Sequence, residues 1–549
     1  MAHKYFGDAD PIGKTLLING KRPMQVTGVA ADVPSNSHLK FDFAGSYSTF
    51  GPKTSWGSAN YYTYVQVTNN EVLPSLRTRL SQLARQQLSE TQLKNGTIYD
   101  FIPEPVTGIH LHSIASDATE ERGDIRYNYI FLVIAVMLLV IACINFMNLA
   151  TARSTERGKE VGVRKALGAQ RSQLFWQFIA ESALLTGIAL ITGVLLAVLL
   201  LPAFKHLTEA NLRIGGTGGY RIYITLAGIF FLATFLTGTY PAMFLSGFKP
   251  VKVLKGTITN PKGGGLRKTL VVFQFAASVF FIICTLAVER QMQYIQHKKL
   301  GLDRSEVLVL NNFRFNFQQF QSFKNRLLQL TGISHVSAAG DSPVSVNGGY
   351  GIDHVEGKAP EYTMNIAAVP VEKDYLKTVG ISLVSGEDLT DGDAQDVLKE
   401  NNEQRVYHFF INETAAKSLG WKPDVAVGKK MTLNGRVGTV KGVMKDFHFT
   451  SMKSRIAPII VFPEYDYLHQ IQVKASGGNK QELIAAIGKI WSEYQPEVPF
   501  EYHFLDEDFN KLYKSEYRVA AVLSTFATVV MVVSCLGLLG LAALTTQQR

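Results

Sequence analysis

Long apolar stretches alternate with polar regions along this chain of 549 residues. Five stretches carry no charged side chain, and each is long enough to cross the hydrocarbon core of a bilayer as a helix. They lie at roughly 129–152, 182–204, 222–248, 269–288 and 519–548. Two longer regions of mixed polarity occupy about 1–126 and 289–517. The pattern predicts a multi-pass membrane protein with two soluble domains.

The region 1–126 has the mixed pattern of an α/β domain. Strand-like alternation at Thr15 to Asn19 and at Gln25 to Val29 flanks a turn that begins at Asn19-Gly20. Three leucines at helical spacing predict a short helix further on, at Leu76, Leu80 and Leu83. We therefore expect strands and helices together in this region.

Positive charge indicates which ends of the apolar stretches face the cytosol. Basic residues cluster directly after the first stretch, where the acidic residues are Glu156 and Glu160, and in the loop 249–268, which has no acidic residue. Cytoplasmic loops of membrane proteins carry such an excess of Lys and Arg. With both segments inside, the regions 1–126 and 289–517 lie outside. The net charge of +10 is therefore a topology signal, and no nucleic-acid partner is indicated.

A short amphipathic helix is predicted at about 154–170, directly after the first span. One side of it carries apolar residues, Val163, Ala166, Leu167 and Leu174. A separate side carries charged residues, Arg157, Glu160, Arg164 and Arg171. Glu160 precedes Arg164 by four residues, which is the favourable order for an ion pair on a helix. The helix is either an interfacial anchor or a docking surface for a cytosolic partner.

The two halves of the chain repeat each other. IGKTLLING followed by VTGVAAD in the first half is matched by VGKKMTLNG followed by VKGVMKD in the second. The apolar stretches also match, with Cys143, Leu149, Ala150 and Arg157 corresponding to Cys535, Leu541, Ala542 and Arg549. Such self-similarity predicts a tandem duplication. By analogy between the copies, we expect the chain to be truncated at both ends, without its first span and its last two spans.

A family resemblance begins in the segment 160–169. Its residues Glu160, Gly162, Arg164, Lys165, Ala166, Leu167, Gly168 and Ala169 resemble the E-x-G-x-R-K-A-L-G-A signature of FtsX-like, MacB-type ABC transporter permeases. The stretches KYFGDADPIGKTL, GTYPAMFLSGFKPVKVLKG and LRKTLVVFQFAASVFF also look like characteristic stretches of that family. The resemblance therefore extends across most of the chain.

The resemblance implies an α-helical transmembrane bundle with two mixed α/β extracytoplasmic domains, each like the MacB periplasmic core domain. It places the chain in the inner membrane of a bacterium as a multi-pass protein, with both large soluble domains outside the cytoplasm. The expected segments are a partial first extracytoplasmic domain at 1–126, an FtsX-like transmembrane domain with three spans at 127–248, a cytoplasmic linker at 249–268, a span at 269–288, the second extracytoplasmic domain at 289–517 and the opening span of a truncated second FtsX-like domain at 518–549.

The implied function is that of a transporter permease subunit without enzymatic activity. Its cytosolic ABC ATPase would be a separate chain, docked on Arg157, Glu160, Gly162, Arg164, Lys165, Leu167 and Gly168. ATP hydrolysis there would move the outer domains, for the export or extraction of peptides, macrolides, lipoproteins or similar amphiphiles. The resemblance also implies a dimer of permease units among membrane lipids, and it leaves a periplasmic adaptor open. The alternative is a signalling or regulatory membrane protein that controls an extracytoplasmic partner such as a cell-wall hydrolase.

Polar residues inside the spans are further candidate sites. Asn145 and Asn148 are three residues apart, on one face of the first span. Their repeat counterparts Gly537 and Gly540 are suited to close helix packing, which favours contact between helices over a polar pathway for a substrate. Glu181, at the start of the second span, either orients that span against the amphipathic helix or is hydrated or paired with a basic loop residue.

No motif indicates an enzyme, a cofactor or a metal. GDADPIGKT has five residues between Gly7 and Gly13, one more than a phosphate-binding P-loop allows. His110 and His112 alternate as they would on a strand, but no acidic or cysteine partner lies at a fixed spacing from them. The acidic run 506–508 is expected to be a turn in solvent. All three cysteines lie in apolar stretches, so no disulfide framework is predicted.

Overall fold

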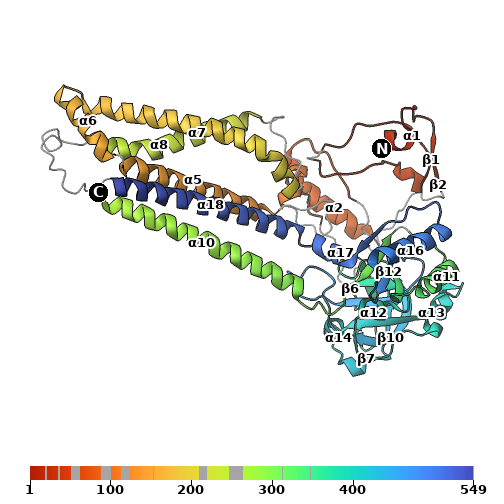
Figure 1. Ribbon diagram of the computed structural model, residues 1–549. Coiled ribbons are helices and arrows are strands. Elements are labelled where there is room, and N and C mark those ends of the chain that lie inside the picture. Colours follow the sequence, from red (N-terminus) through yellow and green to blue (C-terminus); the bar gives the residue numbers. More distant parts are fainter. Residues whose placement is uncertain are drawn as a thin grey trace. The chain divides into compact units, whose positions relative to one another are not determined.

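The computed structural model describes twelve stretches of the chain, residues 1–18, 22–34, 37–50, 62–87, 101–112, 124–152, 154–208, 219–246, 264–311, 313–346, 348–360 and 362–547. The chain forms two compact units, and Figure 1 shows the elements of both. The first unit holds Met1–Gly45, Val106–Tyr294 and Glu516–Arg549, and the second holds Ser46–Pro105 and Ile295–Ser515.

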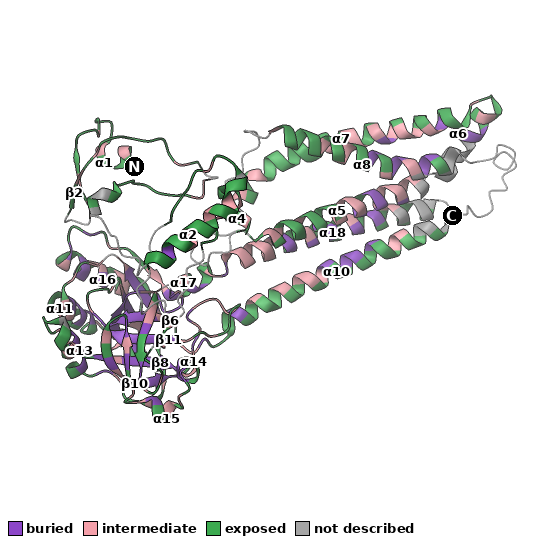
Figure 2. Cartoon of the chain, turned by 180° about the vertical axis from the view of Figure 1, so that it is seen from behind, coloured by how far each residue is buried: buried purple, intermediate pink, exposed green. Residues whose placement is uncertain are grey.

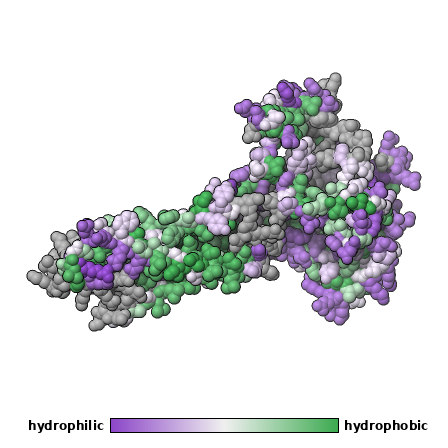
Figure 3. All heavy atoms as spheres, turned by 90° about the horizontal axis from the view of Figure 1, so that it is seen from above, coloured by the Kyte–Doolittle hydropathy of each residue, from purple (hydrophilic) through white to green (hydrophobic). Residues whose placement is uncertain are grey.

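Long helices dominate the first unit. They are α5 (Ile125–Ala152), α7 (Arg171–Thr208), α8 (Gly219–Ser246), α10 (Gly264–His297) and α18 (Lys514–Gln547), with the shorter α6 (Ser154–Ala166) between α5 and α7. Among the described residues, five helices are long and apolar enough to cross a membrane, and each overlaps one of the five predicted spans over most of its length. Hydrophobic side chains cover much of their outer surface, as Figure 3 shows.

All five of these helices begin earlier than their apolar stretches. Helix α7 begins at Arg171 where 182 was predicted, and α10 begins at Gly264 where 269 was predicted. The last residues of the predicted linker 249–268 are therefore helical. Hydropathy detects only the part of a helix that suits the hydrocarbon core, and a helix can continue through polar and basic residues into the interface.

Apolar and small polar residues join α5, α10 and α18. A buried cluster combines Ile134 and Ile141 of α5, Ala277 and Phe281 of α10, and Leu523, Ala527 and Val530 of α18. The hydroxyls of Ser278 and Ser534 lie 2.8 Å apart in a buried hydrogen bond between α10 and α18. These three helices thus pack together although α18 lies far from the other two in the sequence.

A small hairpin lies near the N-terminus. Helix α1 (Ala2–Phe6) is followed by strands β1 (Thr15–Ile18) and β2 (Arg22–Gln25), which pair antiparallel. The first strand lies where alternation predicted it, whereas the second, predicted at Gln25 to Val29, shares only Gln25 with β2 and is therefore misplaced. The predicted turn at Asn19-Gly20 lies outside the described residues. The three leucines of the predicted helix all lie in α2 (Leu73–Gln87), which confirms that helix.

The second unit is built on one large mixed sheet. Its strands are β3 (Val307–Asn311), β4 (Ile333–Ala339), β5 (Gly349–Val355), β6 (Met364–Val371), β7 (Leu383–Gly386), β8 (Tyr407–Asn412), β9 (Lys430–Leu433), β10 (Arg436–Met444), β11 (Ile459–Pro463), β12 (Gln470–Ala475) and β13 (Tyr502–Phe504). Six of them are hydrogen-bonded in the order β11-β8-β10-β9-β5-β6, and the last of these, β6, also pairs with the first, β11. These strands therefore form a closed ring.

Helices and apolar side chains complete this mixed α/β unit. The helices are α11 (Phe317–Leu328), α12 (Tyr375–Val379), α13 (Asp391–Val397), α14 (Glu413–Ser418), α15 (Pro423–Ala426), α16 (Lys480–Tyr494) and α17 (Leu505–Lys511). Asn316 caps α11 and Thr390 caps α13, each with its side chain on a backbone N–H of the first turn. Figure 2 shows buried residues concentrated in the strands. One buried cluster fills the ring, and another lies between α11, α16 and the strands β3, β4 and β12.

Candidate functional site

Helix α6 lies at one end of the helical bundle of the first unit. Figure 1 shows it at the end where α10 begins and α18 ends. The chain leaves α5 at Ala152, forms α6 from Ser154 and enters α7 at Arg171. Val161 and Gly162 are buried, whereas Glu160 and Arg164 are exposed. Helix α6 therefore presents one face to the bundle and a charged face to its surroundings.

A glycine ends α6 and begins a sharp turn. Gly168 has a φ of 101°, a left-handed conformation that favours glycine. The backbone N–H groups of Gly168 and Ala169 donate to the carbonyls of Lys165 and Arg164 at 3.1 and 3.0 Å. Because the helix stops here, Leu174 was wrongly predicted to share an apolar side of this helix with Val163. Leu174 belongs to α7 and is buried, while Val163 and Leu167 are exposed.

The predicted ion pair of α6 is present. Arg164 Nη2 lies 2.6 Å from Glu160 Oε1, and Arg164 Nη1 donates to Gln177 Oε1 of α7 at 3.0 Å. An exposed pair of this spacing is worth only about 0.3–0.5 kcal/mol. The hydrogen bond to Gln177 has the larger structural effect, because it connects α6 with α7 across the turn at Gly168. Arg157 lies in α6, but its side chain is outside the described part of the structure.

Apolar and basic side chains share the exposed end of α6. The Leu167 side chain is 83% exposed and stands next to Gly168 in the turn. The pKa of Lys165 lies below its ordinary value, because the ammonium group of Lys165 is partly buried and because the positive charge of Arg171 is nearby. Trp176 of α7 is also mostly exposed. Trp176 and Gln177 were missed at the sequence level, because their positions depend on the turn that starts a new helix.

The second candidate set lies where α5 meets α18. Asn145 Nδ2 donates to the carbonyl of Val533 at 3.3 Å, and a Cβ added to Gly537 would lie 2.1 Å from Asn145 Oδ1. A Cβ at Gly540 would lie 2.6 Å from a methyl carbon of Leu149. The two glycines thus allow the helices to approach closely. The buried hydrogen bond of Ser278 with Ser534 was not predicted, although small polar residues in two apolar stretches are a signal for such contacts.

Asn148 and Glu181 are the remaining polar candidates inside the long helices. Asn148 is buried, and its Nδ2 has no hydrogen-bond partner in the described structure. Glu181 is half-buried inside α7, ten residues after the helix begins, and it makes an interaction there. The helix that carries Glu181 therefore begins well before the apolar stretch 182–204, at whose start Glu181 stands. The role expected for Glu181 stays a prediction.

Two sequence interpretations outside these sites are corrected. His110 and His112 lie in a short helix, α4 (Ile109–His112), so they do not alternate on a strand. The acidic run 506–508 forms the first turn of α17, and Asp508 accepts hydrogen bonds from Ser342 and Lys511 and pairs with His503. Across the twelve described stretches, no group of three or more His, Cys, Asp and Glu residues is arranged to hold a metal ion.

Comparison with known families assigns both units. Residues 132–250 match the FtsX-like permease C-terminal domain, which covers α7 and α8 and most of α5. Residues 275–490 match the MacB-like periplasmic core domain, which covers the closed ring and most of the second unit. The chain thus contains an FtsX-like permease domain and a MacB-like periplasmic core domain. The following paragraphs therefore refer to an FtsX-like domain and a MacB-like domain.

Relatives of the chain include proteins from two bacteria. The macrolide export ATP-binding/permease protein MacB of Neisseria meningitidis is 30% identical over 211 residues, which are 37% of this chain and 29% of that protein. The uncharacterized ABC transporter permease YknZ of Bacillus subtilis is 28% identical over 198 residues, 35% of this chain and 45% of that protein. The chain thus spans less than half the length of either relative.

One solved structure also aligns with the chain. It is the periplasmic region of MacB from Actinobacillus actinomycetemcomitans, with 15% sequence identity and a TM-score of 0.28. The alignment covers 40% of this chain and 97% of that structure.

Proposed function

We propose that the chain is the permease subunit of an ABC transporter whose ATPase is a separate chain, and that α6 is the surface on which this ATPase docks. The observation that carries the proposal is the arrangement around Gly168. The left-handed turn there leaves Leu167 exposed beside Arg164 and Lys165, at one end of the bundle. An exposed apolar side chain with adjacent positive charge suits a protein partner.

The way in which α6 is held suits the transmission of force. Its buried residue Val161 faces the bundle, and Arg164 connects α6 to Gln177 of α7. A push on α6 would therefore move α7 as well, without first breaking the helix. Nucleotide-driven motion at this end would then be relayed through the long helices to the MacB-like domain.

The proposed location follows from charge. The basic residues of α6 belong on the cytosolic side, and both mixed α/β regions lie on the opposite side of a bacterial inner membrane. Substrates of such a transporter would be peptides, macrolides, lipoproteins or similar amphiphiles that are already at the outer face. Partners would include a second permease unit, surrounding lipids and a periplasmic adaptor. No residue set of the described structure is proposed to be catalytic.

Charge reversal at the turn tests the docking surface. In the double variant Arg164→Glu, Lys165→Glu, we expect the amount of ABC ATPase that co-purifies with the chain to fall about tenfold or more, which corresponds to about 1.4 kcal/mol. Insertion into the membrane should be unchanged. A matched control is Lys417→Glu with Lys489→Glu, two exposed lysines of the MacB-like domain. Normal recruitment and stimulation of the ATPase by the first variant would mean that α6 is not the docking surface.

Single cysteines test the proposed topology. The native Cys143, Cys284 and Cys535 are first replaced by serine, and one cysteine is then placed at Lys489 or at Leu167. A membrane-impermeant maleimide added to intact cells with a permeable outer membrane should label position 489 only. Equal labelling of both positions would place the MacB-like domain on the same side as α6, and the proposal would fail.

A further inference from the structure

Residues 446–452, in the connection between β10 and β11, form a strap that contacts three other parts of the MacB-like domain. Phe447 and Phe449 of this strap are buried, and their rings lie 5.8 Å apart. Both rings pack in the apolar cluster that also holds Val461 of β11. The strap is therefore folded onto the domain and does not extend into solvent.

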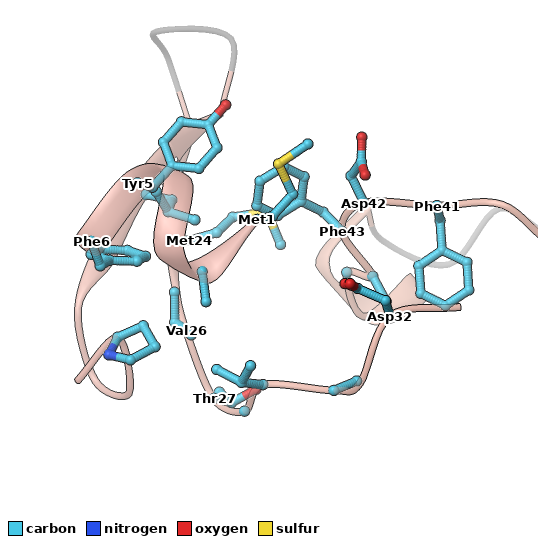
Figure 4. Close-up of a pocket in the computed structure, with 18 of the residues that line it drawn as sticks. Met1, Tyr5, Phe6, Met24, Val26, Thr27, Asp32, Phe41, Asp42 and Phe43 are labelled. Carbon is cyan, nitrogen blue, oxygen red and sulfur yellow. The ribbon is translucent and has the colours of Figure 1, made fainter. Parts of the chain in front are cut away.

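The beginning of the strap is anchored where β8 ends and α14 begins. The carboxylate of Asp446 accepts hydrogen bonds from Thr414 N at 3.0 Å, from Thr414 Oγ1 at 2.7 Å and from Asn412 Nδ2 at 2.7 Å. The N–H of Asp446 donates to Glu413 Oε2 at 2.9 Å. Figure 4 shows the corresponding residue of the first repeat copy, Asp32, on the wall of a hollow of about 700 Å³. In the MacB-like domain, Asp446 fixes the strap to the end of β8, which is one of the strands of the closed ring.

The middle of the strap lies against the residues that follow α10. The N–H of His448 donates to Leu300 O at 2.8 Å. Gly301 has a φ of 87°, and a Cβ added to it would lie 2.6 Å from Asp446 O and 2.9 Å from the Cα of Phe447. Both are backbone atoms, which cannot give way as the end of a flexible side chain can. The chain that leaves α10 and the strap are therefore in direct backbone contact.

The end of the strap is bonded to the residue that precedes α18. The N–H of Met452 donates to Tyr513 Oη at 2.7 Å. Tyr513 is fully buried, and the centre of its ring lies 5.0 Å from that of Phe509 in α17. Loss of the hydrogen bond would leave a buried hydroxyl unsatisfied, which is costly. The strap is therefore tied to the beginning of α18 as well.

Little slack separates these three anchors. His448 comes two residues after Asp446 and four residues before Met452. Because a fully extended chain spans at most 3.6 Å per residue, the longer of the two intervals can reach at most about 14 Å. A displacement of one anchor beyond this slack must either move the next anchor or break its hydrogen bond.

We propose that the strap transmits a displacement of the chain that leaves α10 to the closed ring through Asp446 and to the beginning of α18 through Tyr513. These two are positioning residues, because they act on other parts of the domain and not on a ligand. The ring then follows α10 and α18 together and is not moved by one helix while the other slips. The role of the strap in transport rests on the proposed function, whereas the transmission itself can be measured without an ATPase.

The variant Gly301→Ala tests transmission from the α10 side, because its methyl group must displace the backbone of the strap. Amide hydrogen exchange is followed in the full chain in detergent, with fragmentation that resolves single amides. Relative to the rest of the domain, we expect exchange to become about tenfold faster or more at Met452 and Thr414, which are bonded at the other two anchors. Gly357→Ala is the matched control. Gly357 has a φ of 81°, and no described atom beyond its chain neighbours lies within 4 Å of an added Cβ, so the backbone strain is similar but the clash is absent.

The variant Tyr513→Phe tests transmission in the opposite direction and decides alone if the first variant does not fold. It removes only the hydroxyl that accepts from Met452. Relative to the rest of the domain, we expect exchange to become about tenfold faster or more at His448, four residues before that bond. Tyr494→Phe is the control, because it removes a hydroxyl that is hydrogen-bonded to a serine of α11 at 2.8 Å, outside the strap, and exchange at His448 should not change.

Transmission is supported when each variant speeds exchange at an anchor that it does not itself alter. The proposal is overturned if Gly301→Ala acts only on Asp446 and Phe447, or if Tyr513→Phe acts only on Met452, since the anchors are then independent. Equal acceleration across the whole domain also overturns it, because this reports a loss of global stability. None of these outcomes depends on ATPase docking, so the proposed function can fail while the strap is confirmed, and the reverse.

Discussion

The guanidinium of Arg304 lies over the ring of Phe509, 3.7 Å from its centre. The same group pairs with Asp506 at 3.0 Å and donates to the carbonyl of Gln296 at 2.5 Å. Gln296 belongs to the last turn of α10, and the other two residues belong to α17, which leads into α18. One side chain thus connects the end of α10 with α17, the short helix that directly precedes α18.

Replacement of Arg304 by alanine should loosen this connection. The variant loses the cation–π contact with Phe509 and the ion pair with Asp506, in which the Arg304 side chain is largely buried. Together these two interactions are worth about 2 kcal/mol. We expect the melting temperature of the MacB-like domain, followed by circular dichroism, to fall by about 4–8 °C. Arg326→Ala is the control, since this exposed arginine donates a hydrogen bond to Gln329 at the end of its own helix. Equal shifts in both variants would contradict the special role of Arg304.

Lys324 should be far more sensitive to replacement. Its ammonium group is almost fully buried and contacts Glu372 at 2.8 Å and Asp374 at 2.5 Å. In Lys324→Met the buried carboxylate of Glu372 would lose its positive partner, which costs about 3–5 kcal/mol. Chemical denaturation should report this loss. Lys377→Met, which removes an exposed lysine 3.4 Å from Asp388, should cost less than about 1 kcal/mol.

Stability should fall in acid because of Asp374. Burial alone would raise the pKa of Asp374, but the hydrogen bond and the charge of Lys324 hold it below its ordinary value. A carboxyl group whose pKa is lower in the folded chain than in the unfolded chain stabilises the fold at pH values above its ordinary pKa. This stabilisation is lost as the pH falls through the pKa that the group has in the folded chain. We expect the unfolding free energy to decrease below about pH 4.

The variant Asp374→Asn tests this pH dependence. It should be less stable at pH 7, and its stability should fall less steeply between about pH 4 and pH 2 than that of the unmodified chain. Asp424→Asn, in the exposed first turn of α15, serves as the control and should keep the original slope. The same slope in Asp374→Asn and in the unmodified chain would count against the assignment.

The contact of α5 with α18 can be tested at Gly537. A Cβ there would lie 2.1 Å from Asn145 Oδ1, so Gly537→Ala should separate the helices and cost about 1–3 kcal/mol. Removal of the amide in the double variant Asn145→Ala, Gly537→Ala should restore most of the loss, as a double-mutant cycle would show. Gly193→Ala on α7 is the matched control, because no atom of another element in the described structure lies within 4 Å of a Cβ added there. Additive losses without recovery would contradict direct contact.

Local patterns predicted much of the fold. The five spans follow from the length of apolar stretches, and the Glu160–Arg164 pair follows from helical spacing. The end of α6 was predicted at about 170, beyond the observed Ala166, because the apolar periodicity continued through Gly168 to Leu174. Because the backbone turns at Gly168 in a left-handed conformation, Leu174 belongs to the next helix, α7, where its side chain is buried.

Long-range pairing was beyond the sequence. The strand Ile459–Pro463 lies parallel to Met364–Val371 with Ile459 opposite Ala367, although more than ninety residues separate them. Such pairs depend on the whole tertiary structure and not on local preference. The same is true of Lys324, whose carboxylate partners are 48 and 50 residues away in the chain.

The pairing of β6 with β11 also has a mechanical consequence. An open sheet under tension can be unzipped strand by strand from its free margin, one hydrogen bond at a time. A ring that returns to its starting strand has no such margin, so a pull on one strand must shear bonds along both of its neighbours at once. The domain attached to α10 and α18 is therefore suited to behave as a stiff lever and to pass a displacement on without deforming.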